Sequence, residues 1–376
     1  MTDTTMPKGE TIRIEYVPRP GLGGITIVNF LLGLVTLTIY RFWAKTNVRR
    51  HIWSCVHING QPLEYTGRGI ELFKGALFVF AVLILPVILV ISFLAIAYGP
   101  EHPAIGAIQA LLFLVIAVLW GAALYRARRY QLSRTLWRGI RGSLEGSTVT
   151  YTLLYFGSFL ARAMSLGWST PVLNYSLQEQ MIGSMRFGSM PFRFKGRAGP
   201  LYPSYALCWV LTLVAFVLVI IVVAAGIGTL FSDDLKRIFD EMAGGQNAPA
   251  PEQNIAIIFG SLFVLYLIFF TIYPIIWSLY TAREMAIFAN YTTAEAARFK
   301  MDVSARSVIW LTIGNFLIWI FTLGIGAPFV KQRTIKFLCD RVSVDGTIDV
   351  DAILQSKAPL GTMGEGLADA FDVGGL

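Results

Sequence analysis

Long stretches of the chain are apolar without interruption. Four runs contain no charged residue and cover 76–98, 104–125, 204–231 and 255–281. Each exceeds the ~20 residues that a helix needs to cross the hydrocarbon layer. A segment in lipid must satisfy its own backbone hydrogen bonds, so each run predicts a helix. The pattern therefore indicates a polytopic membrane protein.

Three further apolar runs, 21–40, 149–168 and 307–329, are shorter or interrupted. The first opens with three glycines between positions 21 and 24, the second contains Arg162, and the third ends in Gly324-Ile325-Gly326-Ala327-Pro328. These features are poorly suited to one straight span. They leave two topologies open, one with four spans and one with seven.

The distribution of basic residues separates these topologies. If only the four long runs cross, the outer segments carry 2 of the 31 Lys and Arg residues and the inner segments carry 28. If all seven cross, the two sides carry 19 and 11. Inner loops of membrane proteins are enriched in Lys and Arg. We therefore favour four spans in two hairpins, with the interrupted runs as re-entrant or interfacial helices entered from the cytoplasm. Both termini are then cytoplasmic, and seven spans are the alternative.

The interrupted runs also resemble one another and indicate an internal repeat. Thr36-Leu37-Thr38 aligns with Ser165-Leu166-Gly167 and with Thr322-Leu323-Gly324. The predicted unit is a broken apolar helix, a basic amphipathic helix, a short strand and a long hairpin. It occurs over 21–125 and 149–281, and in truncated form over 307–356. The remaining parts are an N-terminal segment with a short strand (1–20), linkers (126–148 and 282–306) and an acidic, Gly-rich tail (357–376).

Short alternating stretches predict strands. They lie at 11–16, 63–66 and 192–195, where polar and apolar residues follow a period of two. We expect them to form a small cytoplasmic β element. The predicted fold class is thus an all-α polytopic membrane protein with this element attached.

Composition agrees with a membrane protein and weakens other classes. The chain has 376 residues, is 55% hydrophobic and 14% charged, and has a net charge of +8. The basic residues flank apolar runs, which suits anionic headgroups rather than nucleic acid. The three cysteines and three histidines have no metal-ligand spacing, and no catalytic motif is found. We therefore predict no enzyme, no cofactor and no metal.

The run Asn29-Phe30-Leu31-Leu32, the segment from Thr36 to Trp43 and the ending Gly364-Glu365-Gly366-Leu367-Ala368-Asp369 together carry a family resemblance. The chain resembles the YjgN-like bacterial inner-membrane proteins over nearly its whole length. Their defining domain has no known function. The resemblance implies a bacterial inner-membrane location and brings no substrate or catalytic residue.

The candidate functional residues fall into three sets. Polar residues within the apolar runs could line a path or bond helices together, and they are Arg162, Asn29, Asn315 and Gln109. Basic residues expected at lipid headgroups are Arg49, Arg50, Arg126, Arg128, Arg129 and Arg134. The helix-break motif comprises Thr36, Leu37, Gly167, Pro171, Gly324, Gly326 and Pro328.

Two functions remain open at this point. Repeated broken helices are devices that transporters use to build sites at the membrane midplane, which gives a slight preference for a transporter or channel. The alternative is a protein that binds anionic lipid, or holds a partner, without transport. The long runs lack acidic residues, so a proton-coupled transporter is disfavoured.

Overall fold

The computed structural model describes residues 9–230 and 252–358. The chain forms two compact units. The larger contains the residues up to Gly199, residues 286–302 and the chain from Asn315, and the smaller contains 200–285 and 303–314. The predicted outer loop at 232–254 lies almost entirely outside the described residues, as does nearly all of the tail at 357–376.

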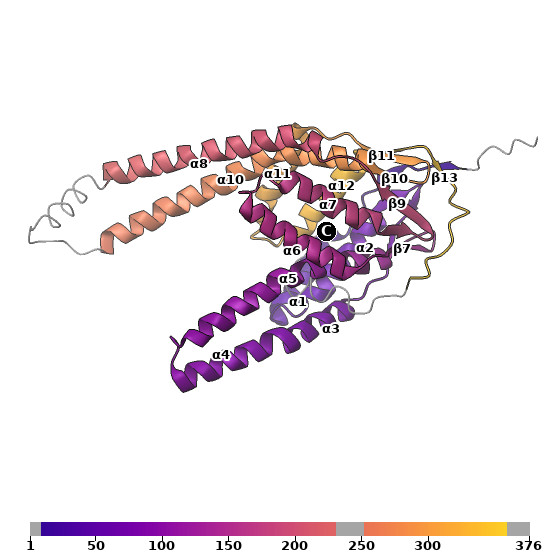
Figure 1. The fold of residues 1–376 in the computed structure, drawn as a ribbon. Coiled ribbons are helices and arrows are strands. Elements are labelled where there is room, and N and C mark those ends of the chain that lie inside the picture. The colour runs from indigo at the N-terminus through magenta and orange to yellow at the C-terminus, as the bar shows by residue number, and fades with distance from the viewer. Residues whose placement is uncertain (1–8, 231–251, 359–376) are drawn as a thin grey trace, which may run out of the picture. The chain divides into compact units, whose positions relative to one another are not determined.

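The larger unit contains an eight-stranded antiparallel sheet (Figure 1). Its strands lie side by side in chain order: β5 (Glu64–Tyr65), β6 (Thr135–Trp137), β7 (Ile140–Leu144), β8 (Met185–Phe187), β9 (Met190–Phe194), β10 (Thr292–Ala294), β11 (Ala297–Met301) and β12 (Val342–Asp345). The expectation of an all-α protein with a small β element was therefore wrong about the sheet. Both predicted linkers contain strands of this sheet: β6 and β7 lie in 126–148, and β10 and β11 lie in 282–306.

Two smaller sheets complete the β structure of the described chain. One joins β2 (Ile14–Tyr16), β3 (Val56–Ile58) and β4 (Gln61–Pro62). The other pairs β1 (Glu10–Thr11) with β13 (Thr347–Ile348), which brings the two ends of the described chain together. Ile348 packs with Trp137, Met190 and Ala294 in the core beneath the large sheet.

The connections of the large sheet alternate between tight turns and helical segments. Tight turns join β6 to β7, β8 to β9 and β10 to β11. In the first turn Arg138 and Gly139 have φ of 51° and 75°, as a type I′ hairpin turn requires. The remaining connections all pass through helices. In an antiparallel meander the two kinds of connection lie at opposite ends of the strands, so the helices leave the sheet from one end.

The helical segments fall into two groups by length. The short pairs are α1 (Leu22–Val35) with α2 (Arg41–Cys55), α6 (Thr148–Met164) with α7 (Thr170–Gly183), and α11 (Ala305–Phe321) with α12 (Ala327–Cys339). The long ones are α3 (Gly69–Val79), which continues through a π-helical turn (Phe80–Ile84) into α4 (Leu85–Tyr98), then α5 (Pro103–Ser133), α8 (Tyr202–Leu230) and α10 (Glu252–Tyr291). Among the described residues, 69–98, 103–133 and 199–221 are long and apolar enough to cross a membrane.

The strand before each helical segment pairs with the strand after it. Thus β2 pairs with β3 around α1–α2, and β5 with β6 around α3–α5. The pairs β7–β8, β9–β10 and β11–β12 enclose the other three segments in the same way. Paired strands lie ~5 Å apart, whereas a bilayer core is ~30 Å thick. A single crossing by any of these segments would separate strands that are hydrogen-bonded, so the geometry favours an even number of crossings in each.

The first helices of the short pairs are 14, 17 and 17 residues long. At 1.5 Å per residue they extend about 21–26 Å, which is less than the hydrocarbon thickness. This length suits a helix that enters the bilayer and turns back. The number of spans and the internal repeat remain predictions.

Candidate functional site

The three helix breaks have the same backbone conformation. Leu37, Leu166 and Leu323 have φ of 49°, 51° and 49°. The residues that follow, Thr38, Gly167 and Gly324, have φ of 70°, 85° and 84°. Their amides donate to the carbonyl five residues earlier over 2.7–2.8 Å. The break is therefore one local structure, and Thr38 adopts it although glycine is favoured at such φ.

A hydroxyl closes each break. Thr36 Oγ1 accepts a hydrogen bond from the Tyr40 amide over 3.0 Å, and Thr322 Oγ1 accepts one from the Gly326 amide over 2.8 Å. In the second copy Ser165 Oγ accepts a hydrogen bond from the Ser169 amide over 3.1 Å. Pro171 and Pro328 stand in the first turns of α7 and α12, where a missing amide hydrogen costs nothing. The motif residues predicted from sequence thus build the breaks.

The leucine at each break protrudes from the protein. Leu37, Leu166 and Leu323 are 83%, 80% and 90% exposed. A left-handed backbone costs a non-glycine residue roughly 1–2 kcal/mol. These positions therefore combine an unfavourable backbone with an unfavourable exposure in water, and contact with lipid would remove the second cost.

Three of the four predicted polar residues bond the two helices of their own pair. Asn29 Oδ1 accepts from Asn47 Nδ2 over 3.4 Å. Arg162 Nη2 donates to Asn174 Oδ1 over 2.7 Å. Asn315 Nδ2 donates to Thr334 Oγ1 over 3.3 Å. Gln109 is exposed on α5. No hydrogen bond between described residues joins one of these four to another.

Four of the six predicted headgroup residues contact protein groups instead. Arg49 donates to the Tyr65 hydroxyl over 3.4 Å, and Arg50 to the Gly67 carbonyl over 3.3 Å. Arg129 donates to the carbonyls of Leu144 and Gly146. Arg134 pairs with Glu71 at 3.0 Å. These arginines anchor α2 and α5 to neighbouring elements.

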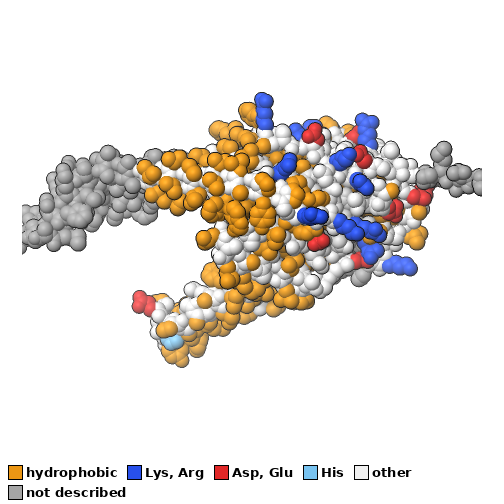
Figure 2. Space-filling view, turned by 45° about the horizontal axis from the view of Figure 1, so that its top comes forward, with side chains coloured by type: hydrophobic (Ala, Val, Ile, Leu, Met, Phe, Trp, Pro, Cys, Tyr) orange, Lys and Arg blue, Asp and Glu red, His pale blue; other side chains and the backbone are white. Residues whose placement is uncertain are grey.

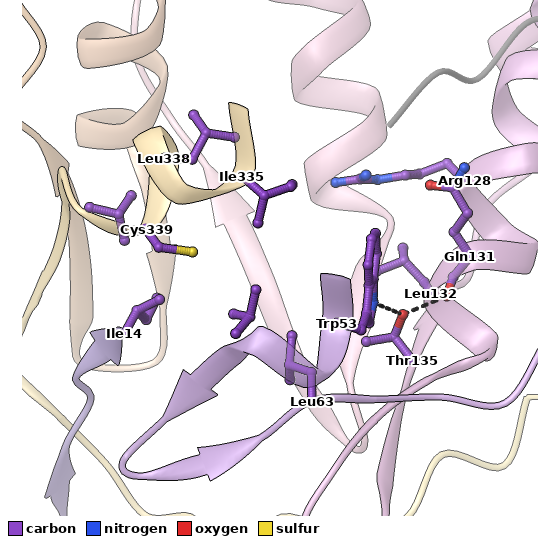
Figure 3. A pocket seen from close by; sticks show the side chains of 12 residues that line it. Ile14, Trp53, Leu63, Arg128, Gln131, Leu132, Thr135, Ile335, Leu338 and Cys339 are labelled. Carbon is purple, nitrogen blue, oxygen red and sulfur yellow. Dashed lines mark hydrogen bonds between the residues drawn. The ribbon is translucent and has the colours of Figure 1, made fainter. Parts of the chain in front are cut away.

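The last two, Arg126 and Arg128, form no hydrogen bond or ion pair with any described residue. Arg128 borders an apolar cavity of about 330 Å³ between α2, α5 and α12 (Figure 3). Arg128 and Gln131 also border a second cavity of about 710 Å³. No local pattern in the sequence marks these cavities, because their walls combine residues far apart in the chain. The first is lined by residues that include Ile14, Trp53, Val56, Leu63, Leu132, Ile335, Leu338 and Cys339.

The sequence profile of a bacterial protein family of unknown function, DUF898, matches residues 21–370. The chain belongs to this family. A member from Salmonella typhimurium LT2, named inner membrane protein YjgN, is 27% identical over 90% of this chain and 91% of its own length. The Escherichia coli K12 protein of the same name is 29% identical over 39% of this chain and 33% of its own length. No solved structure matches the chain.

Membership of this family confirms the resemblance seen in the sequence. The relatives are named as inner membrane proteins, which supports a bacterial inner-membrane location for this chain. The family description gives no activity. The described residues place a cation, Arg128, beside an apolar cavity.

Proposed function

We propose that this protein binds anionic lipid at the cytoplasmic side of the inner membrane, as a multi-pass binding protein and not as an enzyme. The observation that carries the proposal is the conformation of the three breaks. Each places an exposed leucine at the tip of a helix pair too short to cross. We infer that the three tips enter the bilayer from one side, while four long helices cross it as two hairpins.

The charge distribution supports the cytoplasmic side and the anionic preference. In Figure 2 apolar side chains cover the helices of the larger unit, and Lys and Arg side chains gather toward its strands. With the strands inside, 28 of the 31 basic residues lie on the inner side. The pairing of β1 with β13 supports a common side for both ends of the described chain. Basic residues at this level attract anionic headgroups by about 1 kcal/mol each.

Transport has less support than lipid binding. A transport site needs polar groups that converge near the midplane and remain available to a solute. Asn29, Arg162 and Asn315 instead form hydrogen bonds within separate helix pairs. The earlier preference for a transporter therefore gives way to lipid binding, and a repeat of the unit is part of the same proposal.

The anionic preference is tested by lipid titration of the purified full chain. We expect phosphatidylglycerol to raise the melting temperature more than phosphatidylcholine does, and high salt to reduce the difference. Equal stabilisation by both lipids would refute an anionic preference.

Insertion of the tips is tested by lipid quenching. A fluorophore on Leu166→Cys should be quenched by lipids brominated along their acyl chains. Leu354→Cys is the matched control, because Leu354 is a 68% exposed leucine beside the strands, where its amide bonds the Ser189 hydroxyl. Absence of quenching at position 166, or equal quenching at 354, would refute insertion of this tip.

A further inference from the structure

Arg128 differs from the arginines next to it on α5. Arg129 and Arg134 bond to backbone carbonyls and to Glu71. Arg128 points instead into the space between α12 and Trp53 (Figure 3). Its side chain is solvent-accessible and lines both cavities. It is thus an accessible cation without a protein partner among the described residues.

The walls of both cavities contain no carboxylate. The first is lined by twelve residues and the second by twelve, and Arg128 is the single charged side chain in either set. An accessible arginine can be solvated by water, or it can bind an anion through charge-assisted hydrogen bonds. Each wall therefore carries a positive charge that no carboxylate in that wall neutralises.

The remainder of the first cavity is suited to hydrocarbon. Most of its wall consists of aliphatic side chains such as Ile14, Leu63 and Leu338, together with the ring of Trp53. Gln131, Thr135 and Cys339 also line it, and none of the three is charged. The Trp53 indole nitrogen is already bonded to Thr135 Oγ1 over 2.9 Å, so the ring offers an apolar surface. The first cavity has a volume of about 330 Å³ and the second a volume of about 710 Å³. Both volumes lie within the ~300–1,000 Å³ of small-molecule sites.

We propose that this cavity binds a single anionic amphiphile, with its carboxylate or phosphate on Arg128 and its aliphatic chain against Trp53 and α12. The planar guanidinium can donate two parallel hydrogen bonds to either anion. The second cavity, which also borders Arg128, leaves room for a larger headgroup. This inference rests on the proposed function, because the ligand comes from the membrane. It adds one defined binding position to the general attraction between the basic residues and anionic headgroups.

The competing interpretation is that water in the cavities solvates Arg128. Buried water commonly satisfies polar groups in proteins. In that case the cavity would show no preference for an anion with a chain. The two interpretations differ in what substitution of Arg128 does to binding.

The test uses the full chain in phosphatidylcholine nanodiscs and a set of matched probes. Laurate and dodecyl phosphate combine the chain with an anion, dodecanol has the chain alone, and inorganic phosphate has the anion alone. Binding is followed through the fluorescence of Trp53, which a spin-labelled fatty acid quenches. Trp53→Phe identifies the part of the fluorescence that comes from Trp53. We expect Arg128→Ala to weaken laurate and dodecyl phosphate at least tenfold, which is about 1.4 kcal/mol, and to leave dodecanol unchanged.

Matched variants keep the result decisive. Arg126→Ala removes an exposed arginine from the same helix and should leave binding unchanged. Arg128→Lys should retain part of the affinity. Leu338→Trp fills the cavity with Arg128 intact, so it tests the site even if Arg128→Ala fails to fold, and it should abolish binding of both anionic probes.

Each outcome has a distinct meaning. Unchanged laurate and dodecyl phosphate binding in Arg128→Ala, or in Leu338→Trp if the first variant does not fold, would overturn the proposal. Arg128-dependent binding of inorganic phosphate as tight as that of dodecyl phosphate would overturn the membrane source and assign a soluble anion. If phosphatidylglycerol still stabilises Arg128→Ala while laurate binding is unchanged, this site is wrong and the proposed function stands.

Discussion

Glu71 joins the two ends of the first long hairpin, and its removal should be costly. It lies in the first turn of α3 and accepts a hydrogen bond from the Tyr130 hydroxyl over 2.6 Å. It also pairs with Arg134 at 3.0 Å, and the two charged side chains are only 22% and 13% exposed. Tyr130 and Arg134 belong to the far end of the hairpin, so Glu71→Ala breaks a contact between residues far apart in sequence.

The magnitude follows from what the substitution leaves behind. Arg134 would lose its carboxylate in a mostly buried position, and its Nε already has no partner. Removing one member of a buried ion pair costs about 3–5 kcal/mol. Because both side chains retain some exposure, we expect Glu71→Ala to lower the free energy of unfolding by about 2–4 kcal/mol. Loss of a negative charge at the start of α3 adds to this cost.

The assay is unfolding of the purified protein in detergent, followed by denaturant titration and by the melting temperature. Asp340→Ala is the control: its ion pair with Lys336 is 40–52% exposed, so it should cost under about 0.5 kcal/mol. In a double-mutant cycle, Glu71→Ala and Arg134→Ala together should cost less than the sum of the single variants. A loss for Glu71→Ala no larger than that of Asp340→Ala, or strict additivity in the cycle, would refute this reasoning.

Three further predictions concern topology, packing and thiol chemistry. Single cysteines at the exposed positions Gln61 and Ala296, in an otherwise cysteine-free chain, should both resist an impermeant maleimide until cells are opened; labelling of just one would support seven spans. Gly146→Ala should lower the free energy of unfolding by about 1–3 kcal/mol, because a Cβ there would lie 2.2 Å from the Tyr125 hydroxyl. Gly157→Ala should not lower it, because no atom lies within 4 Å of the Cβ position at Gly157. Burial raises the pKa of the Cys339 thiol to about 11. Since the thiolate reacts, alkylation of Cys339 as the only cysteine should rise about tenfold per pH unit from 7 to 9; a plateau in this range would contradict the raised pKa.

The helices were predictable because lipid imposes a simple pattern. Runs of about twenty apolar residues predicted the long helices, and the repeated Thr/Ser-Leu pattern marked the three breaks. Strands such as β9 were predictable from Phe192-Arg193-Phe194, where alternate residues face core and solvent. The alternation of polar and apolar residues in these short segments could not show that they join one sheet, because strand pairing depends on contacts between segments far apart in the chain.

Other strands were missed for an identifiable reason. The basic residues of 126–148 suggested a linker, although Arg138-Gly139 between alternating residues is suited to a type I′ turn. The cavity at Arg128 had no local signal either. Its wall combines α2, α5 and α12 with strand residues. That Arg128 lacks a protein partner among the described residues is known only from the structure, in which Arg129 and Arg134 do have partners. From the sequence, Arg128 is predicted to contact headgroups in the same way as Arg129 and Arg134, because nothing local distinguishes the three.

The order of strands in the large sheet has a consequence for how the chain is made. Each new strand pairs with the one synthesised before it, and every second strand does so after a helical segment that, in the proposed topology, has entered the membrane. Synthesis from the N-terminus can therefore extend the sheet one strand at a time, and domains commonly fold in that direction. At each stage the growing sheet ends in a strand whose outer backbone groups are unpaired, and such an edge is a site of aggregation. Membrane insertion and sheet growth must then alternate, and a segment that failed to return would stop assembly at that strand.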